Sequence, residues 1–217
     1  MRAVIRSVGE ILITVGLVLL LFVGYQLWWT NVRSQAAAQR NTERIIESWQ
    51  AAPAPPITPP SEGEGIALMT IPRLGEDLLD EPVLQGVTLE VLAEGLGHYP
   101  NTALPGQTGN FAVAGHRATN GEPLRNVDQL RIGDLVYVQT QDSWYTYRLF
   151  RDQIVTPNDD WVITTDPFPD EPGTRENLLT LTTCHPRWGS TERWIWWGEL
   201  VAAAPKSAGT PEMAVSG

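Results

Sequence analysis

The first feature of the chain is a long run of apolar positions near its N-terminus. No charged side chain occurs from Ile11 through Val32. A helix of about 22 residues spans about 33 Å, enough to cross a hydrocarbon core of about 30 Å. Arg2 and Arg6 precede the run, and three aromatic residues lie near its far end, Tyr25, Trp28 and Trp29. The pattern predicts a transmembrane segment over residues 11–32, with residues 1–10 in the cytoplasm and the rest of the chain outside.

A cleaved signal peptide is the alternative interpretation, because the small residues Ala36, Ala37 and Ala38 follow the run. The run is longer than the roughly 7–15 apolar residues of a signal-peptide core. We therefore expect an uncleaved signal-anchor, and with it a single-pass protein of the cell membrane whose main domain is extracellular.

Two segments of different composition follow the apolar run. Residues 33–50 are rich in Ala, Arg and Glu, which predicts a helical stalk. Residues 51–64 are rich in proline, which predicts a semi-rigid, extended linker. Such a linker would hold a domain away from the bilayer.

Residues 65–203 change to short apolar runs separated by Gly, Pro, Asn and Asp. Gln141-Asp142-Ser143 marks a hairpin, and Leu89–Leu96 is the best helical candidate. We expect a mainly β domain, closed as a barrel or packed as a sandwich, and a disordered tail over residues 204–217. The pattern predicts strands over Ile66–Ile71, Asn110–Ala114, Leu135–Thr140, Trp144–Phe150, Leu178–Cys184 and Arg193–Val201.

Composition narrows the class of function. The net charge of −10 argues against nucleic-acid binding, which requires clustered Lys and Arg. The only lysine, Lys206, lies in the small and polar C-terminal segment, which argues against lysine-based chemistry. The only cysteine, Cys184, cannot form a disulfide within this chain or a four-thiolate zinc site.

Cys184 lies at the end of a predicted strand, just before His185-Pro186. With a period of two it shares one strand face with Thr180 and Thr182. Proline ends regular strand pairing, so the thiol would be held firmly and yet be exposed. A lone cysteine is more often a small buried apolar residue, but such a residue more often lies mid-strand among aliphatic side chains.

Arg193 opens the next predicted strand, nine residues after Cys184. If residues 185–192 form a loop, the two strands are antiparallel neighbours and the guanidinium lies near the thiol. A neighbouring arginine lowers a thiol pKa and stabilises a developing oxyanion. On spacing alone, a surface arginine paired with Glu192 or Glu199 is the commoner explanation.

Three histidines are candidates for an acid or base. His116 follows a predicted strand and Gly115, and so lies at a strand end as Cys184 does. His98 lies in a glycine-bounded turn. His185 adjoins Cys184, but adjacent strand residues point to opposite faces, which makes His185 a poor base for that thiol. The residues rank His116 first and His98 second.

The candidate residues also carry a family resemblance. Thr180-Leu181-Thr182-Thr183-Cys184, with Arg193 nine positions later and Gly115-His116 before it, resembles the sortase signature TLxTC…R with its upstream histidine. The membrane anchor and four further segments resemble the class E sortases of high-GC Gram-positive bacteria: Gly97–Pro100, Thr102–Gly106, Asn110–Arg117 and Trp194–Trp197. The resemblance covers about residues 65–203.

This resemblance implies an eight-stranded β-barrel with short helices and a cysteine transpeptidase. Cys184 would be the nucleophile, His116 the acid and base, and Arg193 the oxyanion stabiliser. Tyr99 and Thr183 would contact substrate, with Tyr99 associated with a preference for LAxTG over LPxTG; for Thr183, simple β-propensity explains the residue equally well. The implied partners are secreted proteins with such sorting signals and a peptidoglycan or other amine; no cofactor is expected.

Two other functions remain as alternatives. A pilin-polymerising sortase usually carries a lid with an Asp-Pro-Trp-like motif, and residues 51–65 contain no such triplet. A non-catalytic module that binds the cell wall could use the same barrel. An L,D-type transpeptidase would need a Ser-x-Gly-Cys context, which Cys184 lacks.

Two predicted loops contain residues that resemble functional motifs. Residues 104–109, LPGQTG, resemble a sorting signal with one residue too many, and we read them as a turn. Residues 157–172 are too long for a tight turn and could form a wall of a substrate groove. Acidic residues crowd this region, and solvated loop charges explain them better than a calcium site does: Asp159, Asp160, Asp166, Asp170, Glu171 and Glu176.

Overall fold

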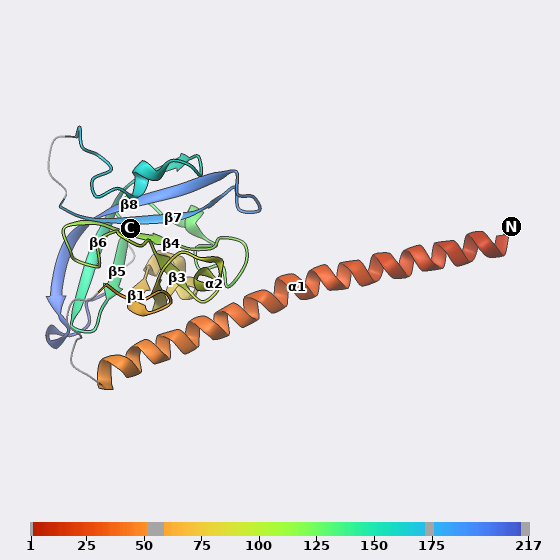
Figure 1. The fold of residues 1–217 in the computed structure, drawn as a ribbon, viewed down its shortest axis with the longest axis horizontal. Helices are drawn as coiled ribbons and strands as arrows, with labels where there is room; N and C mark the ends of the chain where they lie inside the picture. The colour runs from red at the N-terminus through yellow and green to blue at the C-terminus, as the bar shows by residue number, and fades with distance from the viewer. Residues whose placement is uncertain (1, 52–58, 172–175, 214–217) are drawn as a thin grey trace.

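The computed structural model describes residues 2–51, 59–171 and 176–213. Its core is a closed eight-stranded barrel in the order β1-β2-β3-β4-β7-β8-β6-β5 (Figure 1). Two neighbouring pairs, β2/β3 and β4/β7, are parallel, and the other pairs are antiparallel. The strands are β1 (Gly65–Thr70), β2 (Glu81–Gln85), β3 (Leu96–His98), β4 (Gly109–Ala114), β5 (Leu135–Gln139), β6 (Ser143–Val155), β7 (Asn177–His185) and β8 (Glu192–Pro205). The predicted mainly β, eight-stranded barrel is confirmed.

The helices are one long and several short ones. The long helix α1 (Arg2–Ala51) precedes the barrel, and α2 (Leu89–Leu92) is a single turn between β2 and β3. Short 3-10 helices complete the connections: η1 (Pro72–Leu78), η2 (Val127–Gln129), η3 (Asp160–Ile163) and η4 (Lys206–Ala208).

The six predicted strands all form, as does the hairpin at Gln141–Ser143 that joins β5 and β6. The sequence pattern missed β2 and β3, which are short and pair with each other in parallel. The predicted helix over Leu89–Leu96 is wrong beyond its first turn. Gly95 has a φ of 155°, and Leu96 begins β3, because Gly97 must approach the backbone of Gly86 closely.

The two faces of β7 and β8 pack into different layers. Leu179, Leu181 and Trp196 point into the barrel interior. Ile195 and Trp197 point outward and pack with Val155, Val162 and Phe168 beneath the β6–β7 connection. Both faces are therefore covered, and the alternation of large residues along β8 sets the register of the pair.

The helix α1 is not a free stalk in its C-terminal half. Its residues 33–50 are helical, as predicted, but one side of them is buried against the barrel, at Ser34, Ala37, Ala38, Asn41 and Ile45. Ile45 packs with Leu68, Leu84 and Val91, directly over Gly65, where a Cβ atom would collide with it. The domain is therefore held against this helix. The predicted proline-rich linker falls mainly on residues 52–58, outside the described residues.

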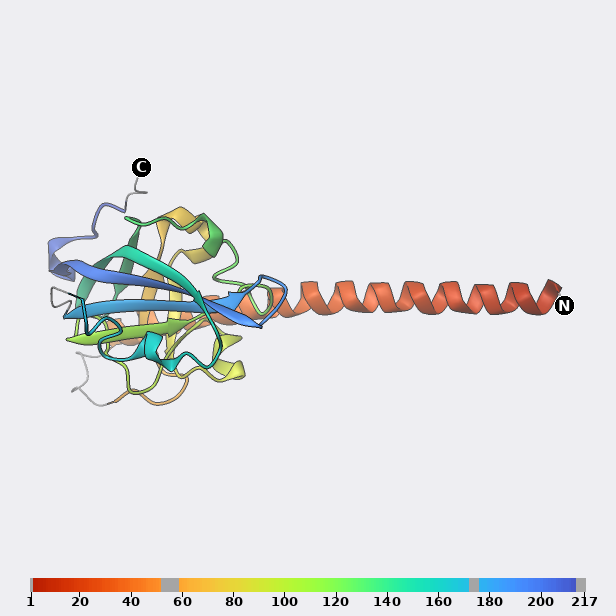
Figure 2. The same ribbon diagram turned by 90° about the horizontal axis from the view of Figure 1, so that it is seen from above.

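The barrel lies lengthwise along this half of α1 (Figures 1 and 2). At one end, Asn31 accepts a hydrogen bond from the Gly121 amide in the loop after β4 (3.2 Å). At the other end, the Trp49 carbonyl accepts one from Gln141 in the β5–β6 hairpin (3.3 Å), and the Lys206 ammonium lies 4.0 Å from the Trp49 ring centroid. The N-terminal half of α1 extends beyond the barrel.

The extending half of α1 is long and apolar enough to cross a membrane, with a mean hydropathy of 2.3 over its best window and no part of that window buried in the protein. An anchor or signal function is consistent with this finding.

The predicted disordered tail over residues 204–217 is wrong for its first part. β8 continues to Pro205, η4 follows, and the carbonyl of Glu212 accepts a hydrogen bond from the Tyr137 hydroxyl (3.1 Å). Residues 204 and 205 are ordered because they pair with the start of β6, at Trp144 and Ser143. Residues 214–217 lie outside the described residues.

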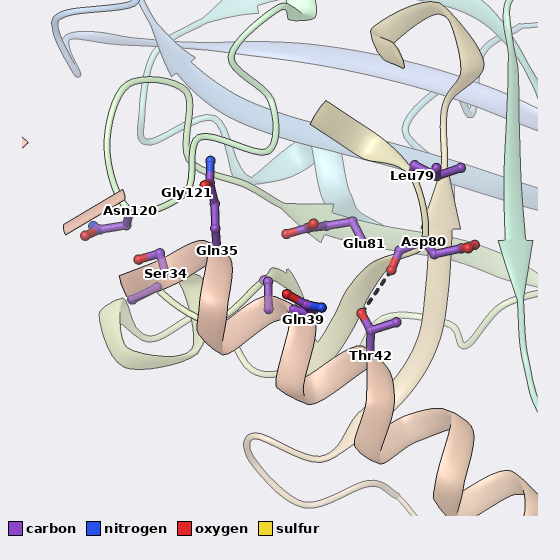
Figure 3. A pocket seen from close by; sticks show the side chains of 12 residues that line it. Ser34, Gln35, Gln39, Thr42, Leu79, Asp80, Glu81, Asn120 and Gly121 are labelled. Carbon is purple, nitrogen blue, oxygen red and sulfur yellow. Dashed lines mark hydrogen bonds between the residues drawn. The ribbon is translucent and has the colours of Figure 1, made fainter. Parts of the chain in front are cut away.

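A polar cavity of about 430 Å³ lies between part of α1 and the barrel (Figure 3). Asn120 and Gly121 lie beside Ser34 at one end of this cavity, and Thr42 donates a hydrogen bond to the Asp80 carbonyl at the other (3.0 Å). Glu81 projects into the space between them. Burial raises the pKa of the Glu81 carboxyl from 4.5 to about 7.

Glu81→Gln is expected to remove a pH-dependent cost of folding. A carboxyl whose pKa is higher in the folded chain favours folding fully below about pH 4.5, and that contribution is lost as the pH rises to about 7. The Tm of the wild type should therefore fall relative to that of the variant between pH 5 and pH 8, by a difference worth on the order of 2 kcal/mol. Thermal unfolding at several pH values measures this, and the exposed Glu90→Gln is the control. Equal pH slopes for the wild type and Glu81→Gln would contradict it.

Candidate active site

The candidate site begins with the pairing of β7 and β8. Cys184 and Arg193 are direct cross-strand partners near the loop of residues 186–191 that joins this antiparallel pair. The predicted placement of Arg193 across the hairpin from Cys184 is thus confirmed, and the residue pair follows from the register that the packed Trp and Leu side chains set. The Cys184 thiol is half-buried.

The second strand of the site is β4, which lies on the other side of β7. The two strands are parallel, with Ala114 opposite Thr182, and the Gly115 amide donates to the Thr182 carbonyl (3.1 Å). Parallel strands end at the same edge, so the same register continued by two residues brings His116 beside Cys184. The strand order therefore brings Cys184, Arg193 and the chain just after β4, where His116 lies, to one end of the barrel.

His116 is half-buried, and its ring has one hydrogen-bond partner among the described residues. The Asn120 amide donates to its Nε2 atom, at a long distance of 3.4 Å. Burial lowers the pKa of the His116 imidazole. Burial therefore disfavours the charged form of the ring, and a proton donor or acceptor role for His116 would need a charged or polar partner beside it.

Arg193 is positioned by its own turn. Its Nη1 atom donates to the carbonyl oxygens of Ser190 and Glu192, each at 2.9 Å. Its Nε and Nη2 atoms have no hydrogen-bond partner among the residues that the structure describes. Arg193 lines a small pocket, and its cross-strand neighbour Cys184 lies beside it.

This pocket, of about 60 Å³, lies on the outer face of β7 and β8. One wall comes from the β6–β7 connection, and the strand side is formed by Thr182, Arg193 and Ile195. The expectation that residues 157–172 contribute a wall agrees with this geometry for Pro157 to Ile163, while residues 172–175 lie outside the described residues.

Tyr99 also lines this pocket, and its hydroxyl lies 2.9 Å from the Thr182 hydroxyl. Thr183 is placed differently. Its side chain points to the opposite strand face, is 3% exposed, and donates a hydrogen bond to the Gly115 carbonyl (2.8 Å). This contact ties β7 to the residue before His116, so the hydroxyl of Thr183 positions the strand ends and does not face the pocket.

The other two histidines are held by structural contacts. His98 is 2% exposed, and its ring nitrogens lie 2.7 Å from Gln85 Oε1, 2.9 Å from Thr102 Oγ1 and 3.0 Å from the Ala103 carbonyl. His185 accepts a hydrogen bond at Nδ1 from Arg117 (3.1 Å) and packs edge-on against Trp194. The ranking of His116 above both agrees with this placement.

Arg117 is the supporting residue that the sequence reasoning did not single out. It is buried, pairs with Asp128 at 3.5 Å, and lies 5.1 Å from the Trp194 ring centroid. It thus joins the loop after β4 to the start of the β7–β8 loop through His185. Its position next to His116 in the chain was the available signal.

Three of the acidic residues in the β6–β7 connection make local structural contacts. Asp159 accepts from the Thr156 amide (2.6 Å), Asp166 accepts from the Phe168 amide (2.9 Å), and Glu171 pairs with Arg151 (2.6 Å). Among the described residues, no group of three or more His, Cys, Asp or Glu side chains is arranged to hold a metal ion.

Comparison with known proteins places this barrel in a family. The family model described as the Sortase domain matches residues 69–201. The chain is 40% identical to sortase SrtE1 of Streptomyces coelicolor over 97% of its own length and 61% of that protein's, and 34% identical to sortase SrtE2 of the same organism over 91% and 82%. The chain thus spans less than two thirds of the length of sortase SrtE1.

Solved structures of sortases also match this chain. The structure of sortase E from Streptomyces avermitilis matches with a TM-score of 0.63 and 44% identity, covering 70% of this chain and 98% of that one. The crystal structure of sortase E1 from Streptomyces coelicolor with a tripeptide in the active site matches with a TM-score of 0.62 and 35% identity, covering 70% and 96%. The chain belongs to the sortase family, and its similarity is to the class E sortases.

We predict that His98 and His116 differ in what they contribute to stability. His98→Ala removes a buried ring and leaves its polar neighbours unpaired, which should lower the free energy of unfolding by about 2–4 kcal/mol. His116→Ala removes one long hydrogen bond and should cost less than about 1 kcal/mol. Urea unfolding of the two variants measures the difference, and equal losses would show that His116 is also held structurally.

Proposed function

We propose that this chain is a membrane-anchored cysteine transpeptidase. It would cleave the C-terminal sorting signal of a substrate protein and join that substrate protein to an amine. The observation that carries the proposal is the gathering of Cys184, Arg193 and the end of β4 before His116 at one edge of a sortase barrel. Acyl transfer requires a nucleophile, a proton carrier and an oxyanion stabiliser, and these three residue types supply them.

In the proposed reaction, the Cys184 thiolate attacks the carbonyl carbon between Thr and Gly of an LAxTG- or LPxTG-like peptide. The guanidinium of Arg193 donates hydrogen bonds to the oxyanion that forms. His116, in its imidazolium form, protonates the leaving glycine amine as the C–N bond breaks, which leaves a thioester on Cys184. An incoming amine then attacks the thioester, His116 accepts its proton, and the thiolate is released.

The proposed acyl acceptor is an amine of the peptidoglycan precursor, and the acyl donors are secreted proteins bearing the sorting signal. A tripeptide in the active site of the related sortase E1 supports a peptide ligand for this kind of pocket. Tyr99 is the proposed determinant of the LAxTG preference, because its side chain lines the pocket beside Thr182. No cofactor takes part in this scheme.

The proposed topology follows from α1. Residues 11–32 would span the membrane, residues 1–10 would be cytoplasmic because Arg2 and Arg6 precede the span, and residues 65–203 would form the extracellular catalytic domain.

Cys184→Ala is expected to abolish the thioacyl intermediate and the ligated product. Mass spectrometry of the full chain mixed with an LAxTG peptide and a glycine amine should show an acyl adduct on the wild type and none on the variant. Omission of the amine should increase the adduct on the wild type. Absence of any adduct or turnover with the wild type would instead favour the non-catalytic wall-binding module.

The same assay with an LPxTG peptide tests the proposed class E preference. We expect faster ligation of LAxTG, and ligation of LPxTG alone would contradict that preference while leaving the transpeptidase chemistry intact.

Arg193→Gln should lower kcat/KM by about 10²–10³-fold, since it removes a charged donor aimed at the oxyanion. The matched control is Arg148→Gln, which removes an exposed arginine from β6 away from the site. Ligation kinetics with the same peptide measure both variants. If the two variants have equal rates, Arg193 is an ordinary surface arginine.

A further inference from the structure

The end of the barrel that carries the site is tied to α1 near its apolar run. The side chain of Asn31 donates to one carboxylate oxygen of Glu122 and accepts from the Gly121 amide. The other carboxylate oxygen of Glu122 accepts from Arg187 in the loop between β7 and β8 (2.9 Å). Glu122 is 8% exposed, so its carboxylate is shielded from water, and it joins α1 to the loop that follows Cys184.

The position of Asn31 along α1 sets the height of this loop relative to the apolar run. Asn31 lies two residues beyond Trp29, which is about 3 Å along a helix axis. Tryptophans at the end of a membrane span lie at the level of the lipid headgroups. Glu122 and Arg187 therefore lie within about one helical turn of the headgroup layer if residues 11–32 span the membrane.

The opposite end of the barrel lies far from that layer. From Asn31 to Trp49, α1 runs along the barrel toward the β5–β6 hairpin, where Gln141 contacts it. Along β8, Arg193 pairs with Val155 and Pro205 pairs with Ser143. Twelve strand residues separate these positions, which is about 40 Å. Figures 1 and 2 show the β7–β8 loop at the end of the barrel from which α1 extends.

The tip of the β7–β8 loop has the chemistry of a membrane interface. Trp188 is 73% exposed, as much as Leu20 in the apolar run of α1. The guanidinium of Arg187 lies 5.0 Å from the Trp188 ring centroid. An indole exposed to this degree gains by entering the headgroup region. Arg187 is paired with Glu122, so the contact with lipid would rest on Trp188.

We propose that the loop of residues 186–191 rests on the headgroup layer of the same membrane that α1 spans, with Trp188 inserted among the phospholipids. The catalytic end of the barrel then faces the bilayer, and the β5–β6 hairpin points away from it. This inference rests on the membrane-anchor part of the proposed function and is independent of the chemistry at Cys184.

The test uses the full chain in phospholipid vesicles with an environment-sensitive fluorophore on a single cysteine. Because Cys184 is the only native cysteine, the background is Cys184→Ala, and Ser190→Cys places the label in the loop while Trp188 is kept. The matched control is Asp142→Cys in the β5–β6 hairpin. We expect a blue-shifted emission at position 190 that spin-labelled phospholipid quenches, and water-like emission without quenching at position 142.

A second variant tests whether Trp188 itself makes the contact with phospholipid. Trp188→Ala in the Ser190→Cys background should abolish most of the quenching by spin-labelled phospholipid. Its thermal unfolding should match that of the parent, because the indole is largely exposed.

The outcomes distinguish the membrane anchor from the contact of the loop with the membrane. Failure of the full chain to co-float with vesicles would overturn the anchor and with it this inference. Co-flotation with equal, water-like emission at positions 190 and 142 would overturn the loop contact alone. The reaction at Cys184 is tested separately by the peptide ligation assay, which does not require vesicles.

Discussion

The site depends above all on the placement of β7 between β4 and β8. Leu179 and Leu181 are buried in the barrel interior, while Thr180 and Thr182 lie on the opposite strand face. A one-residue slip would exchange these faces, so the register is strongly specified. The same register makes Cys184 and Arg193 cross-strand partners and ends β4 beside them. Core packing therefore sets the geometry that we propose for catalysis. The hydrogen bond from Thr183 to the Gly115 carbonyl holds the end of β4 against β7.

A second constraint joins the barrel to its N-terminal helix. Ile45 of α1 covers the start of β1, and Asn31 bonds to the loop that follows His116. An anchor that contacts its domain at both ends restricts how the domain can turn. A cell-surface enzyme on a flexible tether samples many orientations; a docked helix instead presents one end of the barrel consistently. Glu122 and Arg187 connect this helix to the loop that follows Cys184.

The sequence pattern predicted six of the eight strands, including β5 with only five residues. It failed at β2 and β3, because a proline interrupts β2, and β3 has only three residues, one of them glycine, which leaves little periodicity. It also missed the docking of α1, since several residues that are buried there, such as Ser34 and Asn41, are polar. The choice among histidines needed tertiary contacts, because only they show that the His98 ring is surrounded by hydrogen-bond partners.

The sequence by itself determined the apolar run that predicts a membrane anchor, the mainly β domain, and the single thiol at a strand end followed by an arginine. These properties are local, since composition and period act along the chain. Only the tertiary structure decided that β4 lies parallel to β7, that Thr183 faces away from the pocket, and that the catalytic end of the barrel is fastened to α1 beside the apolar run. Those results depend on which distant segments bury one another, and that is set by the packing of the whole barrel.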